Sequence, residues 1–237
     1  MELKASNTNI ANWRNVTVST TIPEPLLPLK ELANNLWWSW NAEVRELFKE
    51  LDPAMWKLVG HNPVLQLSRI KFETLEKFAQ DRNYLYQMNA VYSKFRAYMD
   101  EKPDVSRPSV AYFCMEYGLS HVLKIYSGGL GILAGDYIKE ASDSNVRMCA
   151  VGFLYRFGYF TQALSMNGDQ IAKYEAQNFA QLPIERELDT DGTPIVIDVP
   201  YNNSLKKYAN KTPHRHRCQT PNHQSSCLKP RHQDPFQ

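Results

Sequence analysis

The sequence predicts an α/β chain, with a helical leading domain over residues 1–106 followed by the beginning of a parallel sheet over 107–208. Two observations support this fold class. From Leu26 to about Met99, apolar residues recur at spacings of three and four, which places them on one face of a helix. Beyond this point, short and nearly continuous apolar runs alternate with a glycine loop and a helical segment. Strand, loop, helix and strand in that order are typical of the start of a doubly wound sheet.

The leading domain should contain roughly four or five helices. Asn41 is expected to cap a helix over Ala42–Leu51, and Asp52 with Pro53 to start a short helical turn. A longer helix is predicted over Tyr84–Met99. The apolar face of the first helix contains Leu29, Leu32, Ala33, Leu36 and Trp37.

A tryptophan cluster, Leu36–Asn41 (LWWSWN), supports two interpretations. Its rings can form the core of the helical domain or a platform on which sugars stack. On a helix Trp37 and Trp40 share a face while Trp38 points elsewhere. A platform of three rings is therefore excluded, and a single exposed tryptophan, Trp38, stays open as a hypothesis.

The second part begins with SVAYFCM at 109–115, a run of the kind buried in parallel sheets. A helix over Leu130–Ser144 should follow, and then a second buried strand in VRMCAVGFL at 146–154. The aromatic segment 156–162 (RFGYFTQ) is also expected to be extended. TPIVIDVP at 193–200 alternates and ends in proline, as an edge strand does.

The net charge of +2 is unevenly distributed. Residues 211–237 contain five Lys and Arg against one Asp, which leaves −2 for the remaining residues. The total therefore gives no support to nucleic-acid binding. The apolar runs are far shorter than the roughly 20 residues of a membrane span. The first residues lack the features of a secretion signal, so we expect a cytoplasmic protein.

The tail, residues 209–237, is expected to be disordered or aberrant, as after a frameshift or a wrongly joined gene. It holds four of the six histidines and few large apolar groups, so it cannot bury a core. An alternative is a small zinc knuckle, because four of its residues are potential zinc ligands. These are Cys218, His223, Cys227 and His232. Their spacing lacks the usual tight turn, and we expect no metal site.

Three segments carry chemistry. The first, Tyr126–Gly135 (YSGGLGILAG), is a glycine loop that opens a helix, where free backbone N–H groups and the helix dipole favour an anion. A tight turn would use the same residues. The second is Glu116, which follows the first strand at the edge where open α/β sheets bind ligands. Once buried, this carboxylate needs a ligand or an ion pair, for example with Arg156. The third is Arg156 itself, which lies between aromatic residues and can hold a phosphate or belong to a hairpin.

In this order and spacing the three segments resemble the amino-terminal domain of α-glucan (glycogen, starch and maltodextrin) phosphorylases. The motifs are YF-x-ME-[FY], SGGLG-x-LAGD, an ASD helix end and G-x-x-YR-x-GYF-x-Q, between about Val110 and Gln162. The tryptophan-rich helical part resembles the leading domain of the bacterial branch. The resemblance covers roughly residues 15–208.

The resemblance implies an incomplete Rossmann-like amino-terminal domain of a B-type glycosyltransferase fold. It also implies phosphorolysis of α-1,4-glucans to glucose 1-phosphate with pyridoxal 5′-phosphate as cofactor. Gly128 and Gly129 would be the catalytic residues, with Gly129 also at the cofactor. The residues implied to line the substrate and phosphate cleft are Glu116, Tyr117, Ser127, Gly131, Asp136 and Arg156. Ile132 departs from the animal and plant enzymes, which have arginine there.

The family's cofactor-binding lysine belongs to a carboxy-terminal domain that this chain does not contain, so we expect the chain to be inactive alone. One alternative is a glucosyltransferase resembling glycogen synthase that uses a nucleotide sugar. Such enzymes place a lysine shortly before the glycine pair, whereas here Ser127 precedes it and Lys124 is out of place. Another alternative is a non-catalytic glucan-binding module built on the tryptophans. The oligomeric state cannot be inferred.

Overall fold

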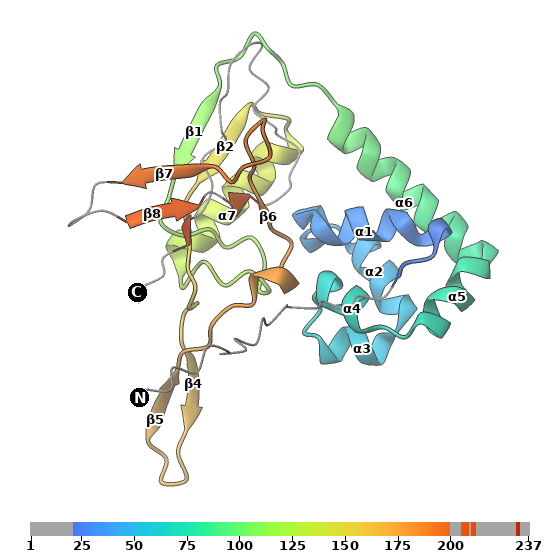
Figure 1. Cartoon of the computed structure of the whole chain (residues 1–237), viewed down its shortest axis with the longest axis horizontal. Helices are drawn as coiled ribbons and strands as arrows, with labels where there is room; N and C mark the ends of the chain where they lie inside the picture. The colour runs from blue at the N-terminus through green and yellow to red at the C-terminus, as the bar shows by residue number, and fades with distance from the viewer. Residues whose placement is uncertain (1–20, 200–204, 209, 212–230, 233–237) are drawn as a thin grey trace, which may run out of the picture.

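The structure, a computed structural model, describes residues 21–199, 205–208, 210–211 and 231–232, with side chains to residue 195. It is a mixed α/β chain with small sheets (Figure 1). Helices occupy the region from Glu24 to Asp100, and the first strand begins at Val110. The proposed tail at 209–237, with its four potential zinc ligands, lies outside the described side chains.

The helical region contains six α-helices and two 3₁₀ helices, somewhat more than the sequence predicts. Their bounds are η1 Glu24–Leu26, α1 Leu27–Asn34, η2 Leu36–Ser39, α2 Ala42–Leu51, α3 Pro53–Leu58, α4 Pro63–Arg69, α5 Phe72–Gln80 and α6 Arg82–Asp100. The predicted helix over Ala42–Leu51 is confirmed, and the last predicted helix is longer by a few residues.

Side-chain caps explain where three of these helices begin. Asp52, Asn62 and Asp81 each precede a helix and accept a hydrogen bond from a backbone N–H in its first turn. The prediction for Asp52 is therefore confirmed. The prediction for Asn41 is wrong, because its side chain makes no cap bond and its amide instead donates to the Trp37 carbonyl at 2.9 Å.

The tryptophan cluster is core. Trp38 is 1% exposed and Trp37 7%, so the hypothesis of an exposed Trp38 is wrong. The reason is that η2 is covered on two sides. It packs on α1 and α2, while the Ser39 hydroxyl donates to the Leu119 carbonyl at 3.2 Å and the Trp40 indole N–H to Asp143 at 3.2 Å.

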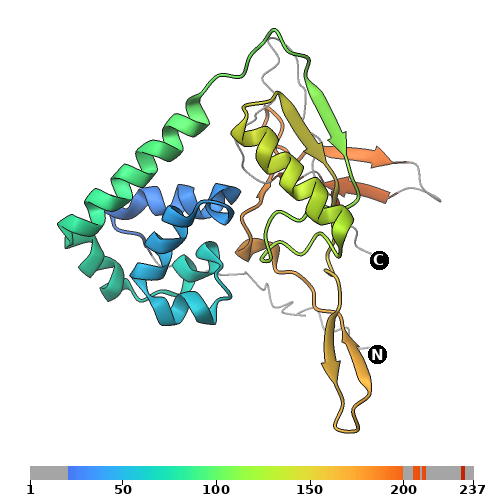
Figure 2. The ribbon, with the colours of Figure 1, turned by 180° about the vertical axis from the view of Figure 1, so that it is seen from behind.

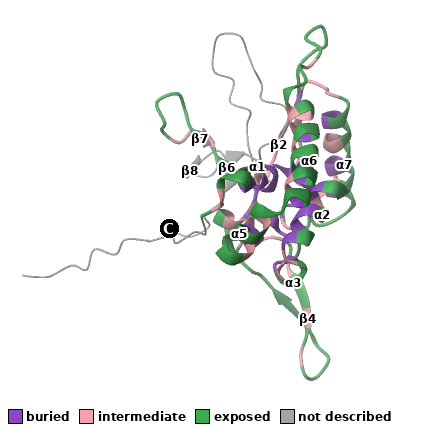
Figure 3. Ribbon diagram, turned by 90° about the vertical axis from the view of Figure 1, so that its right-hand side faces the viewer, coloured by how far each residue is buried: buried purple, intermediate pink, exposed green. Residues whose placement is uncertain are grey.

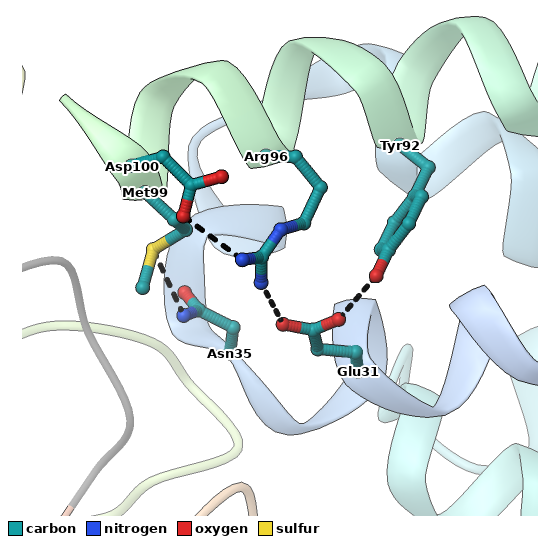
Figure 4. Close-up of polar contacts among 6 residues, drawn as sticks. All are labelled: Glu31, Asn35, Tyr92, Arg96, Met99 and Asp100. Carbon is teal, nitrogen blue, oxygen red and sulfur yellow. Dashed lines mark hydrogen bonds and ion pairs between the residues drawn. The ribbon is translucent and has the colours of Figure 1, made fainter.

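Polar contacts join α1 to α6 at the surface (Figure 4). The Arg96 guanidinium lies between the carboxylates of Glu31, at 2.8 Å, and Asp100, at 2.9 Å. The Tyr92 hydroxyl donates to the other oxygen of Glu31. These side chains are exposed, so the ion pairs each contribute at most about 1 kcal/mol. The apolar core beneath them, with Leu29, Phe48 and Phe95, holds the helices together.

The second part is built on a parallel pair, β1 (Val110–Phe113) and β2 (Met148–Val151), in which Val110 aligns with Met148. Helix α7 (Gly129–Asp143) connects them and covers one face (Figure 2). The predicted strand, loop, helix and strand are therefore confirmed. The expected burial of the first strand is wrong, because Phe113 is 65% exposed. Within the described residues β1 has β2 as its sole strand partner, which leaves one edge uncovered.

The remaining elements are short. β3 (Phe153–Leu154) is followed by an antiparallel hairpin of β4 (Thr161–Leu164) and β5 (Gln170–Lys173), which projects from the body. The Phe160 and Tyr174 rings lie 6.0 Å apart at its base, so the predicted aromatic hairpin is confirmed. Beyond it come η3 Phe179–Gln181, β6 Glu185–Arg186, β7 Val196–Val199, β8 Leu205–Tyr208, β9 Asn210–Lys211 and β10 Arg231–His232.

Burial is uneven along the chain. Figure 3 shows buried positions concentrated where α1 and α2 meet, whereas β4 is mostly exposed. Hydrogen bonds nevertheless tie the helical region to the second part: Tyr98 bonds Ser142, and the Asn62 amide donates to the Gln181 carbonyl at 2.9 Å. Across the part of the chain that the structure describes, none of the helices has the length and apolar character needed to cross a bilayer.

Candidate functional site

The candidate site is the glycine loop at the N-terminus of α7. The chain leaves β1 at Phe113, runs through a loop, and begins α7 at Gly129, beside the carboxyl end of the parallel pair. Gly128 is the residue that precedes the helix, and it supplies no side-chain cap. The positive end of the 15-residue helix α7 therefore faces outward through exposed residues. This is the position at which open α/β sheets bind ligands.

Three glycines around this loop are required by packing. The Gly118 N–H donates to the Gly131 carbonyl at 2.7 Å, so the backbone after β1 lies directly against α7. A Cβ on Gly135 would come within 2.3 Å of the Gly118 carbonyl oxygen. A Cβ on Gly131 would lie 2.5 Å from the Cβ of Tyr126. Any side chain at 131 or 135 would force the loop away from the helix.

Gly128 and Gly129 are different. A Cβ at either position would have no atom within 4 Å. Neither has the positive φ that favours glycine, since Gly128 is extended and Gly129 is helical. Both are exposed. Neither packing nor backbone conformation requires glycine at these two positions. Because they carry no side chain, the backbone N–H groups at the start of the helix are accessible.

Glu116 contacts the loop directly. Its Oε2 accepts the Ser127 N–H at 2.8 Å and the Gly128 N–H at 3.4 Å, and the Ser127 hydroxyl lies 3.5 Å from both carboxylate oxygens. The alternative of an ion pair with Arg156 is wrong, because no such pair forms at Glu116 in the described structure. The structure thus brings Glu116, Ser127, Gly128 and Gly131 together.

Tyr117 lies beneath the loop rather than at its surface. It is 3% exposed, and its hydroxyl donates to the carbonyls of Tyr112 and, at 3.2 Å, Val151. Burial raises its pKa strongly, so the phenol stays protonated. Beside it the Tyr155 hydroxyl donates to the Met115 carbonyl at 3.1 Å. Burial, and secondarily the charge of Glu116, raise the pKa of Tyr155.

Two predicted site residues, Asp136 and Arg156, contact other neighbours. Asp136 is two turns along α7, about 10 Å from Gly129 at 1.5 Å per residue, and its carboxylate lies 3.6 Å from the Lys139 ammonium. Arg156 follows β3, and its guanidinium carbon lies 5.8 Å from the Phe157 ring centroid. The Arg156 carbonyl accepts the Gln177 N–H at 2.7 Å, which fixes the base of the hairpin.

Gln177 is a positioning residue that the sequence did not reveal. Its side chain accepts the Lys124 N–H at 3.0 Å, and donates to the carbonyls of Lys124 at 3.2 Å and Tyr155 at 2.7 Å. It therefore holds the segment before the glycine loop against the residues that follow β3, next to Arg156. No local pattern marks this glutamine, because its partners lie 53 and 22 residues away.

Exposed apolar side chains, here called the apolar rim, lie after β1 and in the first turns of α7. Leu130 is 57% exposed, Leu133 70% and Met115 62%. In a buried α/β unit such side chains are normally covered by other parts of the protein, because large exposed apolar surfaces are costly in water. The rim and the open glycines together form a surface suited to contact with further molecules or chain.

Comparison with known proteins identifies the class of this chain. Residues 22–123 match a family described as a protein of unknown function (DUF3417). The chain is 38% identical over 196 residues to a maltodextrin phosphorylase of Thermococcus litoralis, covering 79% of this chain and 23% of the relative. It is 37% identical over 198 residues to a glycogen phosphorylase of Mycobacterium tuberculosis, with 78% and 23% covered. A glycogen phosphorylase of Aquifex aeolicus is 40% identical over 168 residues, with 69% and 24% covered.

A helical region, an α/β glycine loop and these relatives define a phosphorylase-type chain. The chain belongs to the glycogen and maltodextrin phosphorylase family, and it corresponds to the amino-terminal part of these proteins. It spans about a quarter of the length of the curated relatives that it matches. These relatives favour a phosphorylase over the nucleotide-sugar alternative.

Proposed function

We propose that this chain supplies one wall of the active-site cleft of an α-glucan phosphorylase, and that the reaction is phosphorolysis of α-1,4-glucans to glucose 1-phosphate. The single observation that supports the site is the pair Gly128 and Gly129, whose glycine identity neither packing nor conformation requires. The family relationship supports the reaction, because the relatives are glycogen and maltodextrin phosphorylases.

In this proposal the backbone of the glycine loop faces the phosphate and the glucosyl group. The N–H groups of the first turn of α7 receive no side-chain cap, and the helix dipole favours negative charge there. The absence of a Cβ on Gly128 and Gly129 lets a sugar phosphate approach the main chain. Stabilisation of developing charge by oriented N–H groups is the catalytic contribution of such a loop.

The loop residues fit the phosphate group of pyridoxal 5′-phosphate, and no other part of this cofactor. Gly129 would contribute a backbone N–H towards it, since its amide lies in the uncapped first turn. When bound, the cofactor supplies a phosphate that exchanges a proton with the substrate phosphate. The lysine that holds the cofactor is proposed to lie in the part of the family outside this match, so the chain alone is proposed to be inactive.

The proposed domain architecture rests on the same family relationship with the phosphorylases. Residues 1–106 form the leading domain, 107–208 the start of a Rossmann-like domain of the B-type glycosyltransferase fold, and 209–237 a separate tail. The parallel pair of β1 and β2 with α7 supports the first unit of such a domain. The proposed partners are an α-1,4-glucan and inorganic phosphate, in the cytoplasm.

A titration of the labelled chain with glucose 1-phosphate tests the site. We expect the backbone amide signals of residues 128–131 to shift with saturation, while α6 stays unchanged. Gly129→Ala should weaken this binding several-fold, because its Cβ would occupy the open face. Glu140→Ala is the matched control, since Glu140 lies on the same helix about 16 Å further along.

Two results would count against this function. One is no response of the loop to glucose 1-phosphate in a folded chain. The other is a response to maltoheptaose alone that maps to the helical region and is independent of phosphate, which would support the glucan-binding alternative.

A further inference from the structure

The loop between β1 and α7 is held by a carboxylate that belongs to neither element. Glu116 lies three residues beyond the end of β1, and its Oε2 accepts the N–H groups of Ser127 and Gly128 at 2.8 and 3.4 Å. These two residues directly precede the first turn of α7. A hydrogen bond from a backbone N–H to a charged carboxylate is stronger than one to a neutral acceptor.

The position of Glu116 is itself fixed from both sides. Before it, the Cys114 N–H donates to the Val151 carbonyl of β2 at 3.0 Å. After it, the N–H groups of Tyr117 and Gly118 donate to the carbonyls of Ile125, at 3.3 Å, and Gly131, at 2.7 Å. The carboxylate is therefore presented from a backbone that is tied to the sheet, to α7 and to Ile125.

Gly131 provides the room that this arrangement needs. A Cβ at residue 131 would lie 2.8 Å from Glu116 Oε2. That separation is shorter than a normal contact between carbon and oxygen, so an alanine there would push the carboxylate off the Ser127 N–H. The geometry links three features of the site: the glutamate, the serine before the glycine pair, and the glycine within the helix.

The contacts also divide the amides at the helix start into two groups. Glu116 engages those of Ser127 and Gly128, whereas the first turn of α7 receives no side-chain cap. A serine or aspartate at position 128 would cap the helix in the usual way but would place a side chain over the open face. A carboxylate from the strand side holds the loop without covering that face.

We infer that Glu116 is a positioning residue, which fixes the glycine loop by binding the Ser127 and Gly128 amides, so that no capping side chain is needed at Gly128 or Gly129. The inference goes beyond the proposed cleft. It concerns how the loop is held and does not require that the chain binds glucan, phosphate or cofactor.

Amide hydrogen exchange of the full chain, followed by NMR, tests this role. In Glu116→Ala, exchange of the Ser127 amide should accelerate about tenfold or more, and its proton signal should move upfield. Glu116→Gln should retain part of the protection, because the amide oxygen can still accept one hydrogen bond. Glu140→Ala, which removes a carboxylate near the far end of α7, should leave the Ser127 amide unchanged.

Chemical rescue separates positioning from a general loss of structure. Added formate should restore protection of the Ser127 amide in Glu116→Ala and have no effect on the unsubstituted chain, because a small carboxylate can occupy the vacated position. Equal exchange of Ser127 in the unsubstituted and Glu116→Ala chains would overturn the inference. If Glu116→Ala does not fold, Glu116→Gln carries the test: partial loss of protection at the Ser127 amide with retained shifts in α6 would support the inference, and unchanged exchange of the Ser127 amide would overturn it.

Discussion

The carbonyl oxygen of Gly118 lies so close to α7 that a Cβ on Gly135 would be only 2.3 Å from it. The chain leaving β1 therefore packs main chain against main chain on α7. This contact places Glu116 and the glycine loop on the same side of the helix. It also separates glycines that the fold needs from glycines that it does not need, and this distinction yields the first prediction.

Gly135→Ala should destabilise the chain by about 1–3 kcal/mol, because the added methyl group meets backbone atoms that cannot rotate away. Gly129→Ala should change the free energy of unfolding by no more than about 1 kcal/mol, since its Cβ would meet open space and alanine favours a helix. Urea unfolding followed by circular dichroism measures both. Equal destabilisation by the two variants would contradict the assignment of Gly129 to an open face.

Trp38→Ala should cost about 3–5 kcal/mol, as expected for a large ring removed from a core in which it is 1% exposed. Leu58→Ala is the control, because that side chain is 73% exposed and should cost little. Thermal unfolding distinguishes the two. Should Trp38→Phe fold normally yet abolish binding of maltoheptaose, the tryptophan platform would have to be reconsidered.

Stability should fall at alkaline pH, and Tyr84 should contribute to the fall. Burial, and secondarily the charge of Glu50, raise the pKa of Tyr84 above its usual range. Its phenol therefore stays protonated in the folded chain while the unfolded chain releases the proton. The contribution is complete below the unfolded pKa of about 10, and above it about 1.4 kcal/mol is lost per pH unit.

The measurement is the free energy of unfolding between neutral and alkaline pH. Tyr84→Phe should flatten the alkaline decline, although it also removes the hydrogen bond to the Leu47 carbonyl and lowers stability at neutral pH by about 1 kcal/mol. Tyr86→Phe, at a ring that is 79% exposed, is the matched control. An identical pH profile for Tyr84→Phe and the unsubstituted chain would refute this explanation.

The chain should not retain pyridoxal phosphate. After incubation with the cofactor and gel filtration, we expect no stoichiometric cofactor absorbance, because the loop offers backbone N–H groups for a phosphate and the cofactor lysine is proposed to lie elsewhere in the family. Lys124→Ala serves as a control for chance reaction at the lysine nearest in sequence to the loop. One cofactor per chain, unaffected by this substitution, would show that the proposed division of the site is wrong.

Local patterns determined most of the secondary structure. The apolar spacing over Ala42–Leu51 and the cap at Asp52 depend on residues within one or two turns, so the sequence was sufficient to predict them. The same holds for α7 and for the parallel pairing of β1 with β2, since a strand, a glycine loop and a helix have a limited set of connections. The phosphorylase motifs, which are also local, indicated the family.

Tertiary contacts decided what those motifs do. Trp38 is buried where η2 packs on α1 and α2, and the neighbouring Ser39 and Trp40 bond the second part of the chain, and nothing in LWWSWN encodes these contacts. The loop glycines look alike in the sequence, yet Gly131 is required by packing while Gly128 and Gly129 face open space. Glu116 was predicted to meet a ligand or Arg156, and it makes no ion pair with Arg156 but binds the loop itself, 11 residues away. Sequence periodicity reports which face of an element is apolar, whereas these relationships depend on which segments meet in space.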